Sequence, residues 1–339
     1  MTTEERTAPA GSPTKIGGPA SPSQLGWRSW WGALRRTVTE FNNDNLTDWA
    51  AALTYYGILS LFPGLLVLIA ALRLTGAATT QRVLDGITGL APGAARDVLS
   101  RAADNLLQGQ KSTAGLLALV GLAGALWSSS GYVGAFMRAS NVIYDVPEGR
   151  PLWKTLPIRL ALTVATGVCI AASAGAIVLT GGVAEQLGAF LGIGEVTVLI
   201  WDIAKWPVLV VLISLVFALL YWASPNAQHR GFRWISPGSV LAVVVWLASS
   251  AGFALYVTNF GSYNKTYGSV ASVIIFLIWL WLSNIAVLLG AELEAELQRA
   301  RAAEGGHPLE AEPYMKLRDT RAIKEDENRG VSPEPAPGS

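Results

Sequence analysis

The feature that most constrains the fold of this chain is a set of six long stretches without an ionised side chain. Each contains at least 23 residues, and a helix needs about 20 apolar residues to cross a hydrocarbon core about 30 Å thick. None alternates apolar and polar residues as the strands of a membrane barrel do. The stretches are Trp49–Leu72, Ser112–Met137, Leu160–Ala184, Trp206–Gln228, Trp234–Asn264 and Thr266–Ala291. We therefore expect an all-α integral membrane bundle of six transmembrane helices.

The distribution of charge supports a membrane location. Residues 160–290 contain only seven charged side chains, whereas about a quarter of the residues of a soluble domain are charged. The formal net charge is +1, which argues against a nucleic-acid partner. Cys169 is the only cysteine, so a disulfide framework is excluded. Membrane lipids are the expected partners, and the sequence leaves the oligomeric state open.

The positions of Lys and Arg predict the orientation of the spans. With both termini in the cytoplasm, the inner segments hold 18 of these residues and the outer segments hold seven, in agreement with the positive-inside rule. The tails are rich in Pro, Gly and charged residues, and we expect them to be disordered. The expected organisation is a disordered tail at 1–26, a transmembrane domain at 27–301 with spans at about 49–72, 112–137, 160–184, 206–228, 235–258 and 268–291, and a disordered tail at 302–339.

Two segments outside the spans have helical patterns. Apolar residues that recur every three or four positions place Trp27, Trp30, Trp31, Leu34, Val38 and Phe41 on one helical face. Tryptophans beside arginines favour an N-terminal amphipathic interfacial helix in the headgroup layer, and packing against the other spans is the alternative. The first outer loop, residues 76–110, is long enough for two short helices that cap the bundle.

The outer hairpin between the last two spans carries the clearest candidate site. Tyr263, Asn264, Lys265 and Tyr267 follow one another within five positions. A lysine beside tyrosines offers a point charge and hydroxyl donors to an anionic phosphate or sugar headgroup. The alternative is an aromatic belt with a lysine that extends to the membrane surface.

Further candidate residues lie at the inner ends of spans two and three and in the first span. The inner group is Arg138, Asn141, Glu148, Arg150 and Arg159. It suits either a headgroup entry site or simple anchoring by positive charge. In the first span, Tyr55 and Tyr56 give a polar face, and Pro63 frees a backbone carbonyl and predicts a kink. Such a kink serves either as a gate or as a packing device.

The sequence lacks the residues that several kinds of catalysis and transport require. Metal-dependent RNA hydrolysis requires several His and Asp ligands, but the chain has only His229 and His307. His229 follows the fourth span in a short loop, where we expect a solvated side chain. No phosphate-binding Gly-Lys-Ser or Gly-Lys-Thr motif is present, so a nucleotide-driven pump is not supported. We expect no catalytic residues, no cofactor and no metal site.

Four local sequences, in order along the chain, resemble the YihY/BrkB family of bacterial inner-membrane proteins. They are AALTYYGILSLFP at Ala51–Pro63, RASNVIYDVPEGRPLWKTLPIRL at Arg138–Leu160, ASPNAQHRGFRWISPG at Ala223–Gly238, and FGSYNKTYGS at Phe260–Ser269 with the LLGAELEAEL that ends the following span. The resemblance covers roughly residues 28–300 and excludes both tails.

The resemblance implies a six-helix protein of the bacterial plasma membrane with proposed links to the export of envelope lipid or lipopolysaccharide. Some members of the family have carried a ribonuclease label. The function expected from these observations is a transporter or flippase-like factor for anionic envelope lipids, including lipopolysaccharide-type substrates, that does not use nucleotide. The alternative is a membrane scaffold of the cell envelope that transports nothing.

Overall fold

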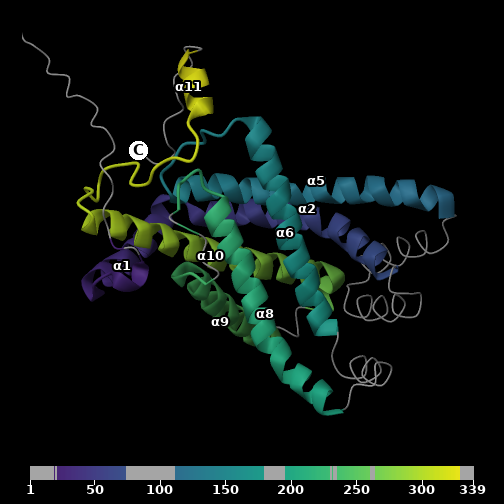
Figure 1. The fold of residues 1–339 in the computed structure, drawn as a ribbon. Helices are drawn as coiled ribbons and strands as arrows, with labels where there is room; N and C mark the ends of the chain where they lie inside the picture. The colour runs from purple at the N-terminus through teal and green to yellow at the C-terminus, as the bar shows by residue number, and fades with distance from the viewer. Residues whose placement is uncertain are drawn as a thin grey trace, which may run out of the picture.

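The computed structural model describes residues 19, 21–73, 111–178, 195–229, 231, 235–259 and 264–328. Its regular elements are helices (Figure 1), and the only β-pairing among these residues is an isolated antiparallel bridge between Ala227 and Leu317. The helices are η1 (Pro22–Gln24), α1 (Trp27–Asn43), α2 (Leu46–Arg73), α5 (Lys111–Ile143), α6 (Leu152–Val178), α8 (Glu195–Ala223), α9 (Pro237–Asn259), α10 (Asn264–Glu304) and α11 (Arg321–Asn328). The expected all-α class is confirmed for the described part of the chain.

Four helices are long and apolar enough to cross a membrane. Among the described residues these spans are Leu152–Ser173, Ile203–Ala223, Pro237–Val257 and Val273–Glu304, in α6, α8, α9 and α10. The first two expected spans coincide with α2 and α5, which have 28 and 33 residues. At 1.5 Å per residue both helices exceed about 40 Å, more than a hydrocarbon core needs. The outer loop at 76–110 lies outside the described residues.

The boundaries of three spans differ from those expected. Helix α8 ends at Ala223, before Pro225, so residues 224–228 form a loop rather than the end of a span. Helix α6 begins at Leu152, directly after Pro151, so Lys154 and Arg159 belong to the helix. Helix α10 continues to Glu304 over 41 residues. Its last turns therefore lie beyond the stretch required to span the bilayer.

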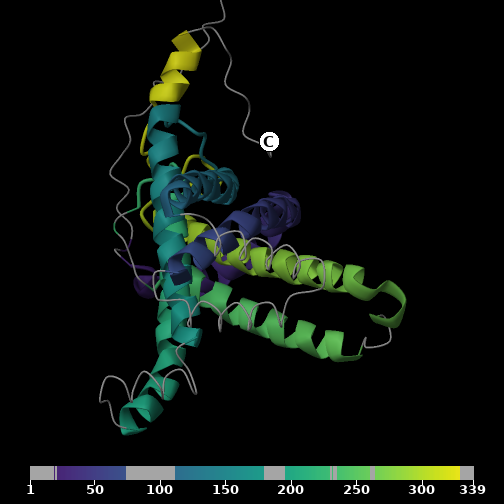
Figure 2. The ribbon, with the colours of Figure 1, turned by 90° about the vertical axis from the view of Figure 1, so that its right-hand side faces the viewer.

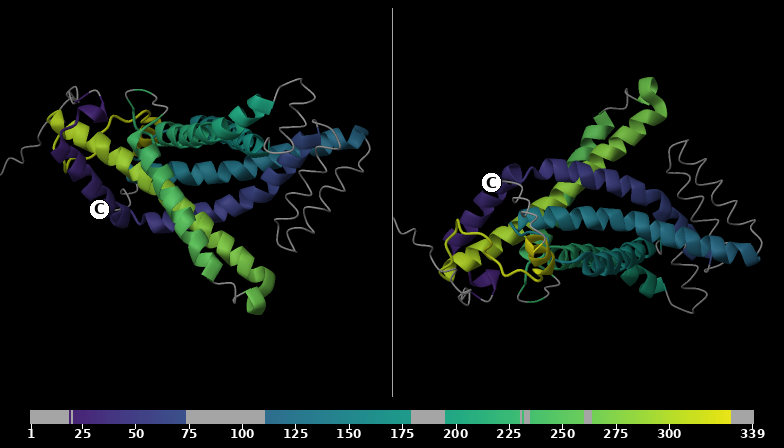
Figure 3. Two further views of the ribbon diagram at one scale, coloured as in Figure 1. Left: turned by 90° about the horizontal axis from the view of Figure 1, so that it is seen from below. Right: turned by 90° about the horizontal axis from the view of Figure 1, so that it is seen from above.

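The long helices form three pairs, α2 with α5, α6 with α8, and α9 with α10. The pairs meet at the end of the molecule that carries the two terminal segments, and they point apart at the other end (Figures 2 and 3). Helix α10 also packs against α1 and α2. The convergent end holds the loops that were expected to be cytoplasmic, and we call it the inner end.

Large apolar side chains cover the outside of the helix pairs. Exposed examples are Val168, Ile170, Ile203, Trp206, Val211, Val244, Leu247 and Ile274. Polar side chains are buried at the same time, including Thr54, Ser130, Asn226 and Asn284. Long helices that are apolar on all sides occur in the core of a large protein or in a membrane. Lipid contact is the environment that this surface requires.

The described parts of the two tails, residues 19, 21–26 and 302–328, pack against the helices, which differs from the disorder expected from composition. Tyr314 and Met315 are 2% and 9% exposed and belong to the main apolar core, and residues 321–328 form α11. At the other terminus Leu25 is buried against Leu293 and Leu297 of α10. A few apolar residues anchor each segment because the inner end of the bundle offers an apolar surface to cover.

Helix α1 packs along α10 and leaves most of its tryptophan face uncovered. Ala33 and Thr37 are buried against α10, whereas Trp27 and Trp31 are 79% and 60% exposed. The rings of these two tryptophans stack with centroids 6.4 Å apart. Trp30 is partly buried, and its Nε1 donates to the carbonyl of Pro22 at 3.0 Å. The helix therefore packs against one span and still presents an apolar face outwards.

Candidate functional site

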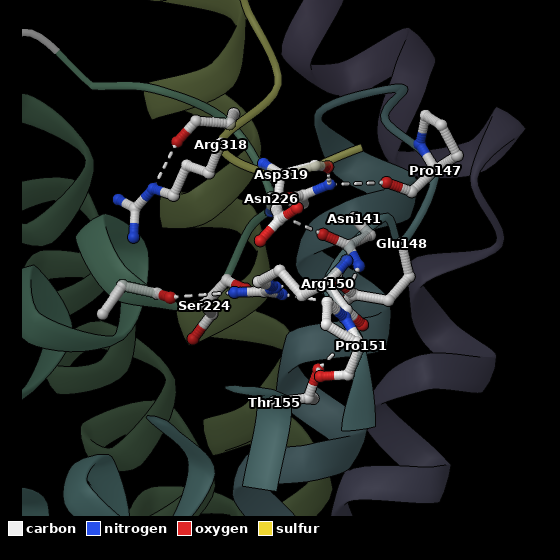
Figure 4. Close-up of polar contacts among 12 residues, drawn as sticks. Asn141, Pro147, Glu148, Arg150, Pro151, Thr155, Ser224, Asn226, Arg318 and Asp319 are labelled. Carbon is white, nitrogen blue, oxygen red and sulfur yellow. Dashed lines mark hydrogen bonds and ion pairs between the residues drawn. The ribbon is translucent and has the colours of Figure 1, made fainter. Parts of the chain in front are cut away.

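Asn226 ties three segments together at the inner end (Figure 4). Its side chain is fully buried, and its Nδ2 donates to the carbonyls of Pro147 at 3.1 Å and Asp319 at 2.9 Å. Its Oδ1 accepts from the backbone N–H of Asp319 at 3.1 Å. The α5–α6 loop, the α8–α9 loop and the C-terminal segment are thus joined by one amide.

The predicted residues Asn141 and Glu148 lie in the same network. The side-chain Nδ2 of Asn141 donates to Glu148 Oε2 at 2.9 Å, and its Oδ1 accepts from the backbone N–H of Asn226 at 2.8 Å. Glu148 also forms a two-point contact with Arg150, at 2.7 Å from both Nε and Nη2. Arg150, 4% exposed, donates further to the carbonyl of Ser224 at 2.8 Å. These side chains are engaged in holding the inner loops.

The C-terminal segment adds its own charges to this network. Arg318 donates to the carbonyls of Ala227 at 2.7 Å and of Trp222. Asp319 accepts from Arg321 and from Lys154 of α6 at 2.8 Å. Hydrogen bonds from Arg321 and then Lys154 hold the pKa of Asp319 below its usual range. The segment is thus fastened across the inner ends of α6 and α8.

Arg159 and Arg138 form a different arrangement. Nε and Nη2 of Arg159 donate to Ser130 Oγ of α5 at 2.9 and 2.6 Å, and its guanidinium lies 5.6 Å from the centre of the Trp127 ring. Gly134 leaves room for this side chain, because a Cβ there would lie 3.2 Å from Arg159 Cδ. Arg138 is exposed on α5, and its charge acts on Arg159. Neither arginine contacts an acid among the described residues.

Tyr55 and Tyr56 of α2 face different surroundings. Tyr55 is 61% exposed, while Tyr56 packs on the main core and its ring lies close to Gly131 of α5. The two rings meet edge to face at 5.4 Å. Tyr56 therefore lies near Ser130, on the side of α5 where Arg159 binds. The side chain of Pro63 lies outside the described residues.

The outer hairpin is only partly described. Tyr263 lies outside the described residues, and Asn264, Lys265 and Tyr267 lie in the first turn of α10, where their side chains are also outside the description. Lys265 and Ala291 are 26 positions apart on one helix, which corresponds to about 39 Å. This distance exceeds the hydrocarbon thickness of about 30 Å. The hairpin and the inner arginines therefore belong to opposite ends of the bundle.

A polar network inside the helices was not among the predicted residues. Tyr132 of α5 donates to Asn284 Oδ1 at 2.8 Å, and Asn284 donates to Thr54 Oγ1 at 3.0 Å. Asn284 is 2% exposed. An amide side chain inside an apolar span is costly unless it has hydrogen-bond partners. The position of Asn284 in the last span was therefore the sequence signal for such a network. The network joins α2, α5 and α10.

His229 differs from the solvated histidine that its short loop suggested. It lies edge to face with the buried Tyr144 at 5.3 Å, and its Nε2 is 3.2 Å from the Tyr144 hydroxyl. Burial, followed by the charge of Arg318, lowers the pKa of His229 to about 4. The C-terminal segment produces both effects by covering the loop. Among the described residues no group of three or more His, Cys, Asp or Glu is placed to hold a metal ion.

These features define an α-helical membrane protein with several spans, whose loops and terminal segments interlock at one end. Comparison with known proteins identifies the particular group. The sequence model of the family described as Virulence factor BrkB matches residues 37–314. The chain belongs to this family, as its local sequences indicated.

Several relatives support the assignment. YfkH of Bacillus subtilis (strain 168), whose name calls it ribonuclease-like, is 32% identical over 262 residues, which cover 76% of this chain and 92% of YfkH. UPF0761 membrane proteins of Chromohalobacter salexigens and Nitrosospira multiformis are each 29% identical over 80% of this chain. The chain spans 64% and 62% of the length of these two relatives. No solved structure matches the chain.

Proposed function

We propose that this chain is a protein of the bacterial plasma membrane that binds anionic envelope lipids and helps to move them across the bilayer. The proposed orientation places both termini in the cytoplasm. The proposed movement uses no nucleotide, because the sequence has no phosphate-binding loop motif. It also includes no enzymatic step. Glycerophospholipids with anionic headgroups and lipopolysaccharide precursors share the phosphate chemistry that the site recognises.

The observation that carries the proposal is the unneutralised pair Arg138 and Arg159. Two like charges on neighbouring helices repel each other, and the repulsion is strongest where water is scarce. Ser130 and Trp127 nevertheless hold the Arg159 guanidinium in place. A phosphate between the two arginines would remove the repulsion and accept hydrogen bonds from both. The pair therefore suits an anionic headgroup in the inner leaflet.

Two further features support a path for lipid. Lys265 and Tyr267 at the opposite end of α10 offer the same chemistry, about 39 Å from Ala291. Between the ends, the helix pairs point apart and expose apolar side chains to acyl chains (Figure 3). A headgroup is thus recognised at both surfaces while its tails stay in the hydrocarbon.

Helix α1 is proposed to lie in the inner headgroup layer. Its exposed face carries the stacked Trp27 and Trp31 together with Leu34 and Val38. Arg28 and Arg35 are exposed on the same helix. Tryptophan and arginine together bind the interface of a membrane with anionic lipids. This placement also agrees with a cytoplasmic N-terminus.

The proposal is tested by lipid binding to protein in nanodiscs. The double variant Arg138→Gln and Arg159→Gln should retain less phosphatidylglycerol on purification than the wild type, with phosphatidylcholine unchanged. Lys324→Gln removes one positive charge from the exposed surface of α11 and serves as the control. Equal retention by the double variant and the wild type would contradict the headgroup site.

A non-transporting scaffold is the second candidate function. Helix α11 projects from the inner end of the molecule (Figure 1), where a cytoplasmic partner has access to it. A variant that lacks residues 321–339 distinguishes the two functions, because it should lose partner binding if the chain is a scaffold and keep lipid movement if the chain is a transporter. The scaffold requires this helix, whereas lipid movement by the bundle does not.

A further inference from the structure

Carboxylates from four segments gather where the inner part of α10 meets the turns after α1 and α5. They are Glu40, Asp44, Asp145, Glu292, Glu296 and Glu312. Two guanidiniums contact this acid cluster among the described residues. Arg36 lies 2.5 Å from Glu296, and Arg299 contacts Asp145, Glu296 and Glu312. Six acids and two bases leave an excess of negative charge around two buried carboxylates, Glu292 and Glu296.

Glu292 is a buried member of the acid cluster with an unpaired carboxylate oxygen. It is 1% exposed, and no donor among the described residues lies within hydrogen-bond distance of its buried Oε2. The charges that act on it most strongly are those of Asp44, Glu296 and Asp145, all negative. No guanidinium or ammonium group among the described residues forms an ion pair with Glu292. A proton on the cluster supplies the missing positive charge and a hydroxyl donor.

Asp44 and Asp145 lie in the turns that directly follow α1 and α5. Asn45, which follows Asp44, has a φ of 51°, and Asp145 has a φ of 50°. Asn and Asp adopt this left-handed conformation more readily than most residues, and it ends each helix. Burial, together with the charges of Asp145 and Glu40, raises the pKa of Asp44 to about 7. Burial raises the pKa of Asp145 to about 6, although Arg299 opposes the shift.

Each element packed around these acids contributes a charged or titratable group. Helix α1 contributes Arg36 and Glu40, α10 contributes Glu296 and Arg299, and the C-terminal segment contributes Glu312 and Tyr314. The turn after α5 contributes Tyr144, and burial followed by the charges of Glu294 and Glu292 holds the pKa of its hydroxyl well above its usual value. Arg299 lies 4.8 Å from the Tyr314 ring. Burial holds the pKa of the Tyr314 hydroxyl well above its usual value. Tyr314 therefore remains neutral, and the carboxylates are the groups that change charge.

We propose that Asp44, Asp145 and Glu292 form a proton-binding site at the inner end of the bundle. The buried, unpaired oxygen of Glu292 beside the carboxylates of Asp44 and Glu296 favours a proton as the bound cation. Release of protons leaves like charges on the α1–α2 turn, the α5–α6 loop and α10, and their repulsion loosens this junction. Proton uptake closes it again. Proton binding here does not depend on which molecule the chain moves.

The test is infrared difference spectroscopy of the reconstituted full chain between about pH 5 and about pH 9. A protonated carboxylic acid has a carbonyl stretch that disappears on ionisation. We expect the wild type to show such a band and Glu292→Gln and Asp44→Asn each to lose part of it. Glu310→Gln, a change of an exposed acid in the C-terminal segment, should leave the band unchanged.

Two results would overturn the proton site. The first is a wild-type spectrum without a titrating band, or with one that both variants retain. The second is a spectral change that follows sodium concentration at fixed pH, which would make the cluster a metal-cation site. The amides in both variants mimic the protonated acids, so the variants should fold. Their unfolding midpoints should depend less on pH than that of the wild type, and equal dependence would also contradict the site.

Discussion

Replacement of Asn226 by Ala tests whether this amide holds the C-terminal segment against the loops. The substitution removes three side-chain hydrogen bonds of 2.9 to 3.1 Å, one to Pro147 and two to Asp319. Only the two bonds to Asp319 hold the C-terminal segment, and at about 1 kcal/mol net for each bond their loss costs about 2 kcal/mol. Because about 1.4 kcal/mol corresponds to a factor of ten, the fraction of molecules with a detached segment should rise about thirtyfold.

Cysteine labelling measures this opening directly. Cys169 is the only cysteine, so Cys169→Ala with Met315→Cys places a single thiol at a position that is 9% exposed. Its maleimide labelling rate should rise about thirtyfold with Asn226→Ala. Asn42→Ala is the matched control, because Asn42 is exposed and its side chain makes one hydrogen bond within α1. A labelling rate within about twofold of the control would refute this role of Asn226.

Three further predictions follow from the inner end and from the candidate chemistry. Gly149→Ala should detach the C-terminal segment and expose residues 305–328 to protease, because a Cβ would lie 2.1 Å from the Asp319 carbonyl oxygen; unchanged proteolysis would contradict this contact. His229 is neutral in the folded chain, with a pKa of about 4 against 6.5 unfolded, so its contribution to stability is present above about pH 6.5 and is lost as the pH falls towards 4. In His229→Phe the unfolding midpoint should fall less on acidification than in the wild type. An unchanged dependence of the midpoint on pH would contradict the neutral state of His229. Purified protein should not degrade RNA when Mg²⁺ or Mn²⁺ is added, and metal-dependent degradation would overturn the proposed non-enzymatic role.

The sequence predicts the helices of this chain well because their signal is local. Each of the six uncharged stretches falls on a long helix, and four of these helices are long and apolar enough to cross a membrane among the described residues. The helix ends are less well predicted, because the first charged residue after an apolar stretch marks where the hydrocarbon core ends and not where the helix ends. Helix α10 continues through Glu292 and Glu296 for this reason, since its inner turns are covered by α1 and the loops.

The inner network could not be predicted because its contacts join distant segments. Asn226 and Asp319 are separated by 93 positions, and nothing near either residue indicates the other. The C-terminal segment has the composition of a disordered tail, although Tyr314, Met315 and Leu317 form a short apolar cluster within it. That cluster was the available signal. The arginines at the inner end were predicted, but their division into Arg150, which has an acidic partner, and Arg138 and Arg159, which have none among the described residues, required the structure.

The central claim is that the chain moves anionic lipids and that Arg138 and Arg159 bind the headgroup. The most direct measurement is the transfer of a fluorescent anionic lipid between the leaflets of vesicles that contain the purified protein, with and without a proton gradient. We predict that the wild type moves this lipid faster than protein-free vesicles do. The double variant Arg138→Gln and Arg159→Gln should fall to the protein-free rate, and Lys265→Ala should be slower than the wild type. A wild-type rate equal to that of protein-free vesicles, or a double variant as fast as the wild type, would contradict the claim.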